Sequence, residues 1–431
     1  MNKNLFAPVP PMGWNSWDCY GASVNEEQLL SNARYMANNL KDYGWQYIVC
    51  DIQWSEPKTV YQAYSPFTDL CMDEFSRLIP AENRFPSSKG GKGFKPIADK
   101  IHAMGLKFGI HIMRGIPRQA VHRNTAIKGT DITARQIAKT YSICPWNTDM
   151  YGIDCSKEGA QAYYDSIFEL YAQWEVDFVK VDDICASNFD KAKPYHAPDE
   201  VEAIHKAIEK CGRPIVLSLS PGPAVVEEAF HLSQNANMWR ITDDFWDEWR
   251  LLLDMFSRCR KWYTHVRLGC WPDCDMLPLG QIALFDKNPD GTRGRKTRFT
   301  KPEQITMMTL WSIFRSPLIM GGDLNGNDDF TLSLLTNREI IEINQFSSGG
   351  HPVIDNDDFK LWACICSDGS TAVAVFNVKD EPAEREIDLS LLGIVKAKAR
   401  ALWNHCDLGE VTDKLVVTLE PHGAAMIKFS E

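Results

Sequence analysis

Short apolar runs alternate with longer amphipathic segments along the first three quarters of the chain. Leu29, Ala33, Met36 and Leu40 recur at helical spacing, and residues 45–52 (WQYIVCDI) then form an apolar run of strand length. Similar runs follow between further amphipathic segments, at residues 106–113, 176–181, 214–220 and 237–242. Runs that are apolar on both faces are typical of parallel strands covered by helices, so the pattern predicts repeated strand–helix units.

Three further short runs complete the strand count. They lie near Met12, just before Trp271, and at residues 317–320. With the five runs above they give about eight parallel strands, the number that closes a barrel. We therefore expect an α/β fold in the form of a (β/α)8 TIM barrel. An open, doubly wound sheet is the structural alternative, but no GxGxxG sequence follows the first strand, which disfavours its usual dinucleotide-binding form.

Ser23 and Glu26 precede the helical run that contains Leu29. Their spacing is that of a capping box, in which a serine hydroxyl and a glutamate carboxylate satisfy the first backbone amides of a helix. We therefore expect this pair to begin the first long helix.

The hydrophobic pattern changes after about residue 348. Residues 360–366, 372–378 and 415–419 alternate in the manner of strands, and Gly and Asp clusters rather than helical runs separate them. We expect a small antiparallel β-sandwich domain over residues 349–431 that covers one side of a catalytic barrel formed by residues 1–348. We find no chemistry in the smaller domain.

Charge and apolar content exclude several classes of protein. The net charge of −11 argues against a uniformly basic face for nucleic acid. No run of eighteen or more apolar residues is present, so we expect no membrane partner. The start of the chain has no apolar run of signal-peptide length, and the 13 cysteines show no CxxC spacing. We expect reduced thiols in a cytoplasmic protein, and a homo-oligomer is compatible with the sequence.

Charged side chains gather at the predicted carboxyl ends of five strands. Barrel enzymes carry their chemistry at these ends, and aspartate is disfavoured inside strands and costly to bury unpaired. The residues are Asp51, His111, Lys180 with Asp182 and Asp183, Arg240 with Asp243 and Asp244, and Asp273 with Asp275.

Three interpretations of this charge cluster compete. In the first, Lys180 and Arg240 only neutralise neighbouring aspartates in structural ion pairs. In the second, the carboxylates bind a metal ion. His111 is the only imidazole among these residues, which disfavours zinc, and the two cations already supply positive charge where magnesium would bind, so we expect neither a metal nor another cofactor.

The third interpretation is cleavage of a sugar. Glycosidases place two carboxyl groups on either side of the scissile bond, and aromatic side chains offer apolar faces to sugar rings. Four tryptophans lie near predicted strand ends: Trp14, Trp17, Trp54 and Trp271. A carbohydrate substrate would account for the carboxylates and the aromatic residues together.

Five segments, in this order, resemble the α-galactosidase and α-N-acetylgalactosaminidase family of retaining glycoside hydrolases (glycoside hydrolase family 27, melibiase-like). They are PPMGWNSW near the start, FVKVDD, WRITDD, WPDCDML and WSIFRSPLIMGGDL. The resemblance covers residues 8–345. It implies a (β/α)8 barrel followed by an antiparallel β domain, which agrees with the hydrophobic pattern.

The resemblance also implies roles for single residues. Asp182 would be the nucleophile and Asp244 the acid/base of a retaining exo-glycosidase acting on terminal α-D-galactosides or a close analogue. Alternation along the strand favours Asp182 over Asp183, because Lys180 and Asp182 face the same side. Lys180 would hold Asp182 ionised and contact the sugar, and Arg240 would act near the 2-position. The remaining expected substrate-binding residues are Trp17, Asp51, His111, Asp275 and Met276.

Two positions depart from the family pattern and bear on the substrate. Members that act on galactose usually carry two adjacent aspartates after the second strand, and here Asp51 is followed by Ile52. An alkyl group cannot satisfy the sugar hydroxymethyl and fills its space, so β-L-arabinopyranosidase is an alternative activity. The small residues Ser220, Pro221 and Gly222 after the fifth strand would leave room for an N-acetyl group, which makes α-N-acetylgalactosaminidase a second alternative.

Two alternatives from other classes remain at this stage. One is a non-catalytic carbohydrate-binding barrel, which the presence of both Asp182 and Asp244 disfavours. The other is a metal-dependent barrel enzyme, whose activity a chelator would abolish.

Overall fold

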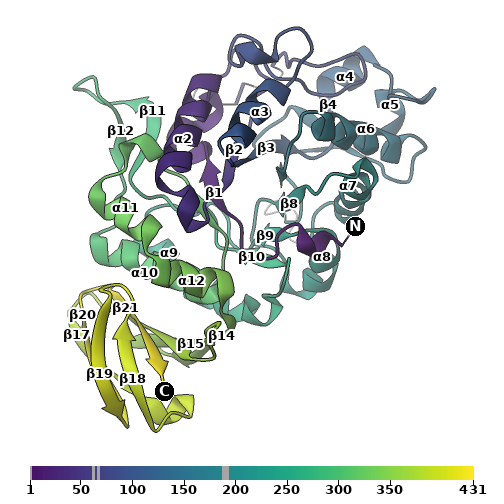
Figure 1. The fold of residues 1–431 in the computed structure, drawn as a ribbon. Coiled ribbons are helices and arrows are strands. Elements are labelled where there is room, and N and C mark those ends of the chain that lie inside the picture. The colour runs from purple at the N-terminus through teal and green to yellow at the C-terminus, as the bar shows by residue number, and fades with distance from the viewer. Residues whose placement is uncertain (1, 61–63, 66–67, 187–193) are drawn as a thin grey trace.

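A closed parallel barrel forms the larger part of the molecule (Figure 1). The computed structural model describes residues 2–60, 64–65, 68–186 and 194–431. Neighbouring barrel strands are parallel throughout, which confirms the predicted TIM barrel. In chain order they are β1 (Met12–Asn15), β2 (Tyr47–Cys50), β3 (Lys107–Met113), β7 (Phe178–Asp182), β8 (Val216–Leu219), β9 (Met238–Arg240), β10 (Trp271–Asp273) and β13 (Leu318–Met320).

The last seam of the barrel is made just beyond β10. Leu277 forms a parallel bridge with Met320 of β13. Its N–H donates to Ile319 O at 2.8 Å, and its carbonyl accepts from Gly321 N at 3.0 Å. These contacts close the ring of strands and bring the segments after β10 and β13 to the mouth of the barrel.

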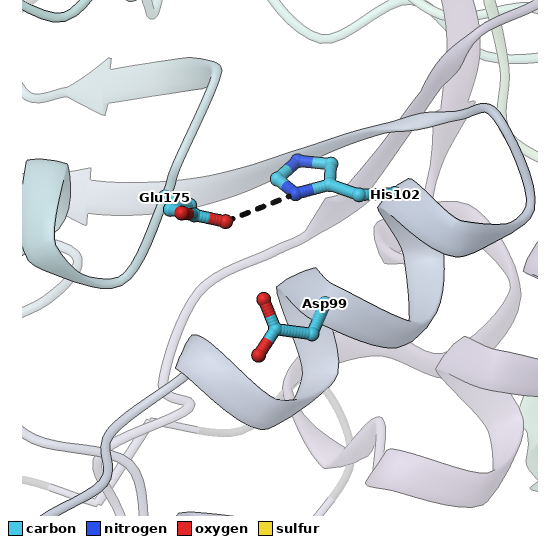
Figure 2. A group of neighbouring side chains, drawn as sticks. All are labelled: Asp99, His102 and Glu175. Carbon is cyan, nitrogen blue, oxygen red and sulfur yellow. Dashed lines mark ion pairs between the residues drawn. The ribbon is translucent and has the colours of Figure 1, made fainter.

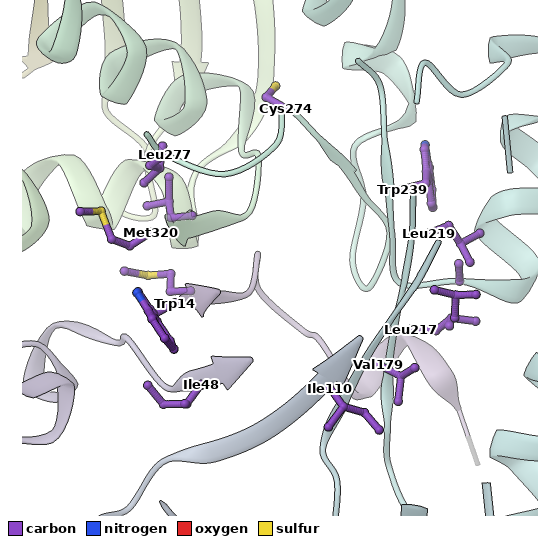
Figure 3. Close-up of a cluster of buried hydrophobic side chains, with 14 of the residues drawn as sticks. Trp14, Ile48, Ile110, Val179, Leu217, Leu219, Trp239, Cys274, Leu277 and Met320 are labelled. Atoms are coloured by element: carbon purple, nitrogen blue, oxygen red, sulfur yellow. The ribbon is translucent and has the colours of Figure 1, made fainter. Parts of the chain in front are cut away.

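Helices surround the barrel and cover the outward faces of its strands (Figure 1). Figure 3 shows these outward side chains, among them Trp14, Ile48, Ile110, Val179 and Trp239, which are all buried. The helices are α1 (Trp17–Tyr20), α2 (Glu26–Asn39), α3 (Lys95–Ala103), α6 (Ala160–Gln173), α7 (Pro198–Cys211), α8 (Ala229–Asn235), α9 (Trp249–Trp262), α10 (Lys301–Phe314), α11 (Asp329–Thr336) and α12 (Arg338–Phe346).

The predicted cap of α2 is wrong by two residues. Asn25 and Gln28 form the capping box, each side chain accepting from the other's backbone N–H at 3.0 Å. Ser23 instead ends a 3-10 turn, and its hydroxyl donates to Tyr20 O. Asparagine caps a helix as well as serine does, so the spacing alone could not separate the two pairs.

Two additions to the barrel were not predicted from the sequence. One follows β3 and contains β4 (Ile116–Pro117), β5 (Ala138–Ile143) and β6 (Met150–Ile153) in one small sheet, with α4 (Arg118–Arg123) and α5 (Ala134–Ile137). The other is a hairpin of β11 (Gln281–Lys287) and β12 (Arg293–Lys296). The turn between β5 and β6 contributes to the mouth of the barrel.

The amino end of the barrel interior is closed by apolar side chains. Tyr47, Phe178, Val216, Met238 and Trp271 point inward from five different strands and form one buried cluster. The rings of Tyr47 and Phe178 lie 5.4 Å apart between centroids. This plug leaves the carboxyl end as the side from which a substrate can enter.

The C-terminal domain is the β-sandwich that the sequence predicted (Figure 1). Leu361 and Val375 point into the sandwich, whereas their neighbours Trp362 and Phe376 pack with the barrel core. The central part of the larger sheet is therefore buried on both faces. Its strands are β14 (Ser348–Asp355), β15 (Phe359–Ile365), β16 (Thr371–Asn377), β18 (Lys396–Ala401), β19 (Cys406–Thr412) and β21 (Ala424–Ser430), and the smaller sheet pairs β17 (Ala383–Asp388) with β20 (Lys414–Leu419).

Two further observations concern the chain as a whole. All 13 cysteines are free thiols. No helix among the described residues is both long and apolar enough to cross a membrane.

Candidate active site

A pocket of about 290 Å³ opens at the carboxyl ends of the barrel strands. It brings together side chains from segments that are far apart in the sequence. Nine predicted site residues line it: Trp17, Asp51, Ile52, Lys180, Asp182, Arg240, Asp244, Asp275 and Met276. Two others, His111 and Ser220, do not.

Asp182 is the last residue of β7 and points toward the barrel axis, as alternation from Phe178 and Lys180 predicts. Its Oδ2 lies 3.1 Å from His111 Nε2, and its Oδ1 accepts the N–H of Asp183 at 3.0 Å. Burial alone would raise the pKa of the Asp182 carboxyl, but the His111 hydrogen bond and the Lys180 charge outweigh it and lower the pKa. Asp182 is therefore an ionised carboxylate in a buried position.

The ion-pair partner of Lys180 is Asp51 rather than Asp182. Lys180 Nζ lies 3.0 Å from Asp51 Oδ2, which also accepts from Asn15 Nδ2 at 2.7 Å. Burial would raise the pKa of Asp51, but Lys180 holds it well below its usual range. Lys180 therefore acts on the pKa of Asp182 only through its charge at longer range, because His111 makes the direct contact.

Arg240 joins two carboxylates on the other side of the pocket. Its guanidinium lies 2.9 Å from Asp275 Oδ1 and 3.1 Å from Asp244 Oδ1. Asp275 is buried and also accepts the N–H of Phe245 at 2.8 Å. The Asp244 side chain is 65% exposed. Asp244 is therefore anchored at one oxygen and open to the pocket mouth, which suits a group that exchanges protons with solvent.

Asp183 leaves the strand direction and takes a separate partner. It has a positive φ of 56°, and its Oδ2 lies 2.9 Å from Arg114 NH2. Burial raises its pKa to about 6, against the pull of Arg114. The side chain borders the pocket but does not share the position of Asp182.

One wall of the pocket is apolar and was largely missed by sequence reasoning. Ile52 is 3% exposed and packs in a cluster with Met113 and Met150, against which Trp17, Tyr64 and Trp146 lie. The rings of Trp17 and Tyr64 stack with centroids 6.1 Å apart, and Tyr64 and Trp146 are 5.6 Å apart. Tyr64 and Trp146 lie in loops, where no periodic pattern marks a residue for the site.

Ser220 lies behind the pocket surface. It is 2% exposed, and its N–H donates to Val181 O at 2.8 Å. Pro221 lines the pocket in its place. A Cβ atom at Gly222 would lie 2.0 Å from Thr242 O, so this glycine packs against backbone. The small residues 220–222 therefore serve close packing rather than an open recess.

Three of the four tryptophans near strand ends belong to the core. The indole N–H groups of Trp14, Trp54 and Trp271 donate to the carbonyls of Gly322, His111 and Ala7. Of these four tryptophans, only Trp17 lines the pocket. A tryptophan near a strand end can face either the barrel mouth or the helix layer, and the sequence does not distinguish these.

Among the described residues, one group has metal-ligand spacing, and it lies outside the pocket. Asp99, His102 and Glu175 offer ligand atoms within 4.8 Å of one another (Figure 2). Lys95 pairs with both Asp99 and Glu175, and His102 Nε2 lies 2.7 Å from Asp177. The ammonium group already compensates these carboxylates, so we assign no metal to them.

Comparison with known proteins places this site in a family. Residues 146–346 match the family model of α-galactosidase A, and residues 356–429 match that of the α-galactosidase C-terminal β-sandwich domain. α-Galactosidase 2 of Arabidopsis thaliana is 27% identical over 99% of this chain and 90% of its own.

Two solved structures are more similar. A family 27 β-L-arabinopyranosidase of Geobacillus stearothermophilus is 57% identical, with a TM-score of 0.96 over 100% of this chain and 98% of that one. A candidate α-N-acetylgalactosaminidase of Bacillus halodurans C-125 is 54% identical, with a TM-score of 0.87 over 98% and 97%. On the match of both domains and of the full length, the chain belongs to glycoside hydrolase family 27, the family of the α-galactosidases.

Proposed function

We propose that the protein is a retaining exo-β-L-arabinopyranosidase. The observation that carries this proposal is Ile52, a buried alkyl side chain in the pocket wall directly after Asp51. β-L-Arabinopyranose has the ring configuration of α-D-galactose but lacks the hydroxymethyl group. A pocket built around Ile52 favours the sugar without that group, because a hydroxymethyl there would lose its hydrogen bonds and compete for space.

The surroundings of Ile52 keep this wall rigid and apolar. Ile52 contacts Met113, Cys144 and Met150 on its buried side, and Tyr64 and Trp146 extend the wall. The cavity beside Ile52, Met113 and Met150 holds only about 30 Å³, so a repacked side chain would find little room there. The wall therefore supports the exclusion of sugars that carry a hydroxymethyl group at C5.

One of the two similar solved enzymes supports the same assignment. The relative that is 57% identical over the full length is itself a β-L-arabinopyranosidase. A variant of that enzyme has been solved in complex with arabinose.

The geometry of the pocket supports the two catalytic roles that the family resemblance implies. Asp182, ionised and buried, would attack the anomeric carbon and form a covalent glycosyl-enzyme. Asp244, at the open mouth, would protonate the leaving oxygen and then remove a proton from the attacking water. Lys180 with Asp51 would bind the 4-hydroxyl side of the ring, and Arg240 the 2-hydroxyl side.

α-D-Galactosidase is the second candidate activity. The Asp51–Lys180 pair supports it, since it offers charged partners to an axial 4-hydroxyl that both sugars share. α-N-Acetylgalactosaminidase has less support, because Ser220 does not line the pocket and Gly222 packs against the backbone of Thr242.

Aryl β-L-arabinopyranoside, α-D-galactoside and α-N-acetylgalactosaminide test the proposal in one panel. We expect kcat/KM for the arabinopyranoside to exceed that for the galactoside by about tenfold or more, the discrimination that one extra group in an apolar pocket permits. Equal values would refute the assignment. Ile52→Asp should move the ratio toward the galactoside, whereas the matched control Ile52→Val, which stays apolar, should not.

The stereochemical part of the proposal has its own readout. Proton NMR of the first product should show the same anomeric configuration as the substrate. An inverted product would exclude Asp182 as a nucleophile whatever the preferred sugar is.

A further inference from the structure

Asp18 is a pocket residue that neither the family motifs nor the mechanism above uses. It lies on α1 directly after Trp17, lines the pocket, and is 2% exposed. Its Oδ2 is buried and has no hydrogen-bond partner among the described residues. A buried carboxyl oxygen without a partner costs free energy, so a native protein that keeps one has a use for it.

The space for this carboxyl is provided by a glycine on the neighbouring segment. A Cβ atom at Gly321, which follows β13, would lie 1.9 Å from Asp18 Oδ2. Any other residue at 321 would displace the carboxyl group. The site is therefore shaped by two segments: Asp18 Oδ2 packs toward Gly321, while the Asp18 residue lines the pocket.

The charged neighbours of Asp18 define both its state and its place. Burial first, and then the charges of Asp275, Asp244 and Asp51, raise its pKa well above the usual range, while Lys180 opposes them. These surroundings favour the protonated form of the Asp18 carboxyl. Asp51 and Lys180 of one ion pair and Asp275 of the other all act on its pKa, so Asp18 lies within electrostatic range of both pairs.

A neutral carboxyl group offers what the four charged groups assigned to the ring, namely Asp51, Asp182, Lys180 and Arg240, lack. Ionised Asp51 and Asp182 only accept hydrogen bonds, and Lys180 and Arg240 only donate them. A protonated carboxyl does both, which is the pattern of a sugar hydroxyl. The 3-hydroxyl is the ring position between the 4-hydroxyl, assigned to Asp51 and Lys180, and the 2-hydroxyl, assigned to Arg240.

We propose that Asp18 is a specificity-determining residue whose protonated carboxyl donates a hydrogen bond to the 3-hydroxyl of the glycone. The proposal rests on the orientation of the sugar given under the proposed function. It extends that function by a contact that selects for the oxygen at position 3 and that requires a neutral acid.

Deoxy substrates combined with two variants test the contact. For the wild type, kcat/KM should fall by about 10- to 100-fold when the 3-hydroxyl is removed from the preferred aryl glycoside. In Asp18→Leu, which keeps the shape without the polar group, the parent substrate should lose a similar factor and the 3-deoxy substrate little. Asp18→Asn, which restores a neutral donor, should recover most of the difference between the two substrates.

A control variant separates recognition from folding. Tyr20 lies on the same short helix as Asp18 but does not line the pocket. Tyr20→Phe removes the hydrogen bond that the Tyr20 hydroxyl donates to Asp323. It should lower the melting temperature but keep the wild-type ratio of parent to 3-deoxy substrate. Because this ratio does not depend on the amount of folded enzyme, a poorly folding Asp18→Leu sample still gives an answer.

Three outcomes would overturn the inference. One is a parent to 3-deoxy ratio in Asp18→Leu equal to that of the wild type. Another is an Asp18→Asn variant as impaired as Asp18→Leu, which would show that the ionised form is used. The third is an Asp18→Leu variant in which the ratio of parent to 4-deoxy substrate collapses while the ratio of parent to 3-deoxy substrate does not. All three are measured on whichever glycoside the wild type prefers, so failure of the arabinopyranosidase assignment is seen separately.

Discussion

Strand β7 has two ends that serve different purposes. Phe178 at its amino end points inward and joins the apolar plug with Tyr47 and Trp271. Asp182 at its carboxyl end points inward as well, where it lines the pocket and contacts His111 behind it. The same alternation thus supplies packing at one end of the barrel and charge at the other, with Lys180 between them.

This difference teaches how the barrel can hold so many buried charges. Ionised side chains lose hydration when they are buried, and paired partners recover only part of it. The plug contributes apolar burial at a distance from the substrate, and the indole N–H of Trp271 within it is satisfied by the Ala7 carbonyl. Substitutions in the plug should therefore change stability, and substitutions at the mouth should change activity.

The largest effect should come from Asp182→Ala. Without the nucleophile we expect kcat to fall by about 10⁴-fold or more on every glycoside, since removal of a covalent catalyst leaves only binding and electrostatics. The melting temperature should stay close to that of the wild type, because the substitution removes the cost of a buried charge together with the hydrogen bond to His111. Steady-state kinetics and thermal unfolding check the two halves. A large loss of stability would contradict the claim that the carboxyl end of β7 serves activity and its amino end serves stability.

Phe178→Ala is the matching change in the plug. Truncating a buried phenylalanine costs about 3–5 kcal/mol of unfolding free energy. We expect that loss in denaturant unfolding, with kcat/KM unchanged well below the melting temperature. Phe178→Leu, which keeps most of the volume, should lose less than about 1.5 kcal/mol. A comparable loss of kcat/KM in Phe178→Ala would show that the plug and the mouth are coupled.

Asp273 offers an intermediate case, since it lies at the mouth but outside the pocket lining. Burial and the Asp275 charge raise its pKa to about 7 in the folded protein, against about 3.9 in unfolded chains. The folded state therefore holds the proton more tightly, and stability is lost as pH rises through this window. Asp273→Asn should gain about 2 kcal/mol over the wild type between pH 5 and pH 8.

Unfolding in urea at several pH values measures this gain. The exposed Asp357 provides a control position, at which the same substitution should show no such trend. A constant difference between Asp273→Asn and the wild type at all pH values would show that the Asp273 proton is not held by the fold.

The smallest effect concerns His111, which contacts the nucleophile without lining the pocket. His111→Leu removes a hydrogen bond that lowers the pKa of Asp182, so the acidic limb of the kcat/KM profile should move to higher pH. The maximal rate should fall by about tenfold, the worth of one hydrogen bond to a charged group. His111→Gln keeps a donor and should restore much of both; an unmoved limb in His111→Leu would count against this role.

The sequence predicted the elements that alternate regularly and the residues placed at their ends. Lys180 and Asp182 share a face because strand geometry fixes the direction of side chains two residues apart, and this could be known in advance. The eight strands and the sandwich followed from apolar runs for the same reason. Arg240 and Asp275 were named as site residues, but their contact joins two strands and could not be derived from either one.

The remainder depended on contacts between distant loops. Trp146 enters the site from an addition after β3 that has no strong period, and Ser220 was misplaced because a loop after a strand can turn toward or behind the pocket. Asp18 was overlooked because its importance lies in the missing partner and in the glycine opposite. Such features depend on contacts between two segments of the chain, so the sequence of neither segment predicts them.

Helix α10 shows why the two domains form one inseparable unit. From Glu303 to Phe314 nearly every residue is buried, so this helix has no stripe that could face water. The sandwich sheet covers one side of it, and Trp403 Nε1 and the His422 carbonyl hydrogen-bond two of its threonines. Removal of residues 349–431 would expose the apolar side chains of this helix to water. We therefore expect a chain shortened to residues 1–348 to aggregate and to lack activity.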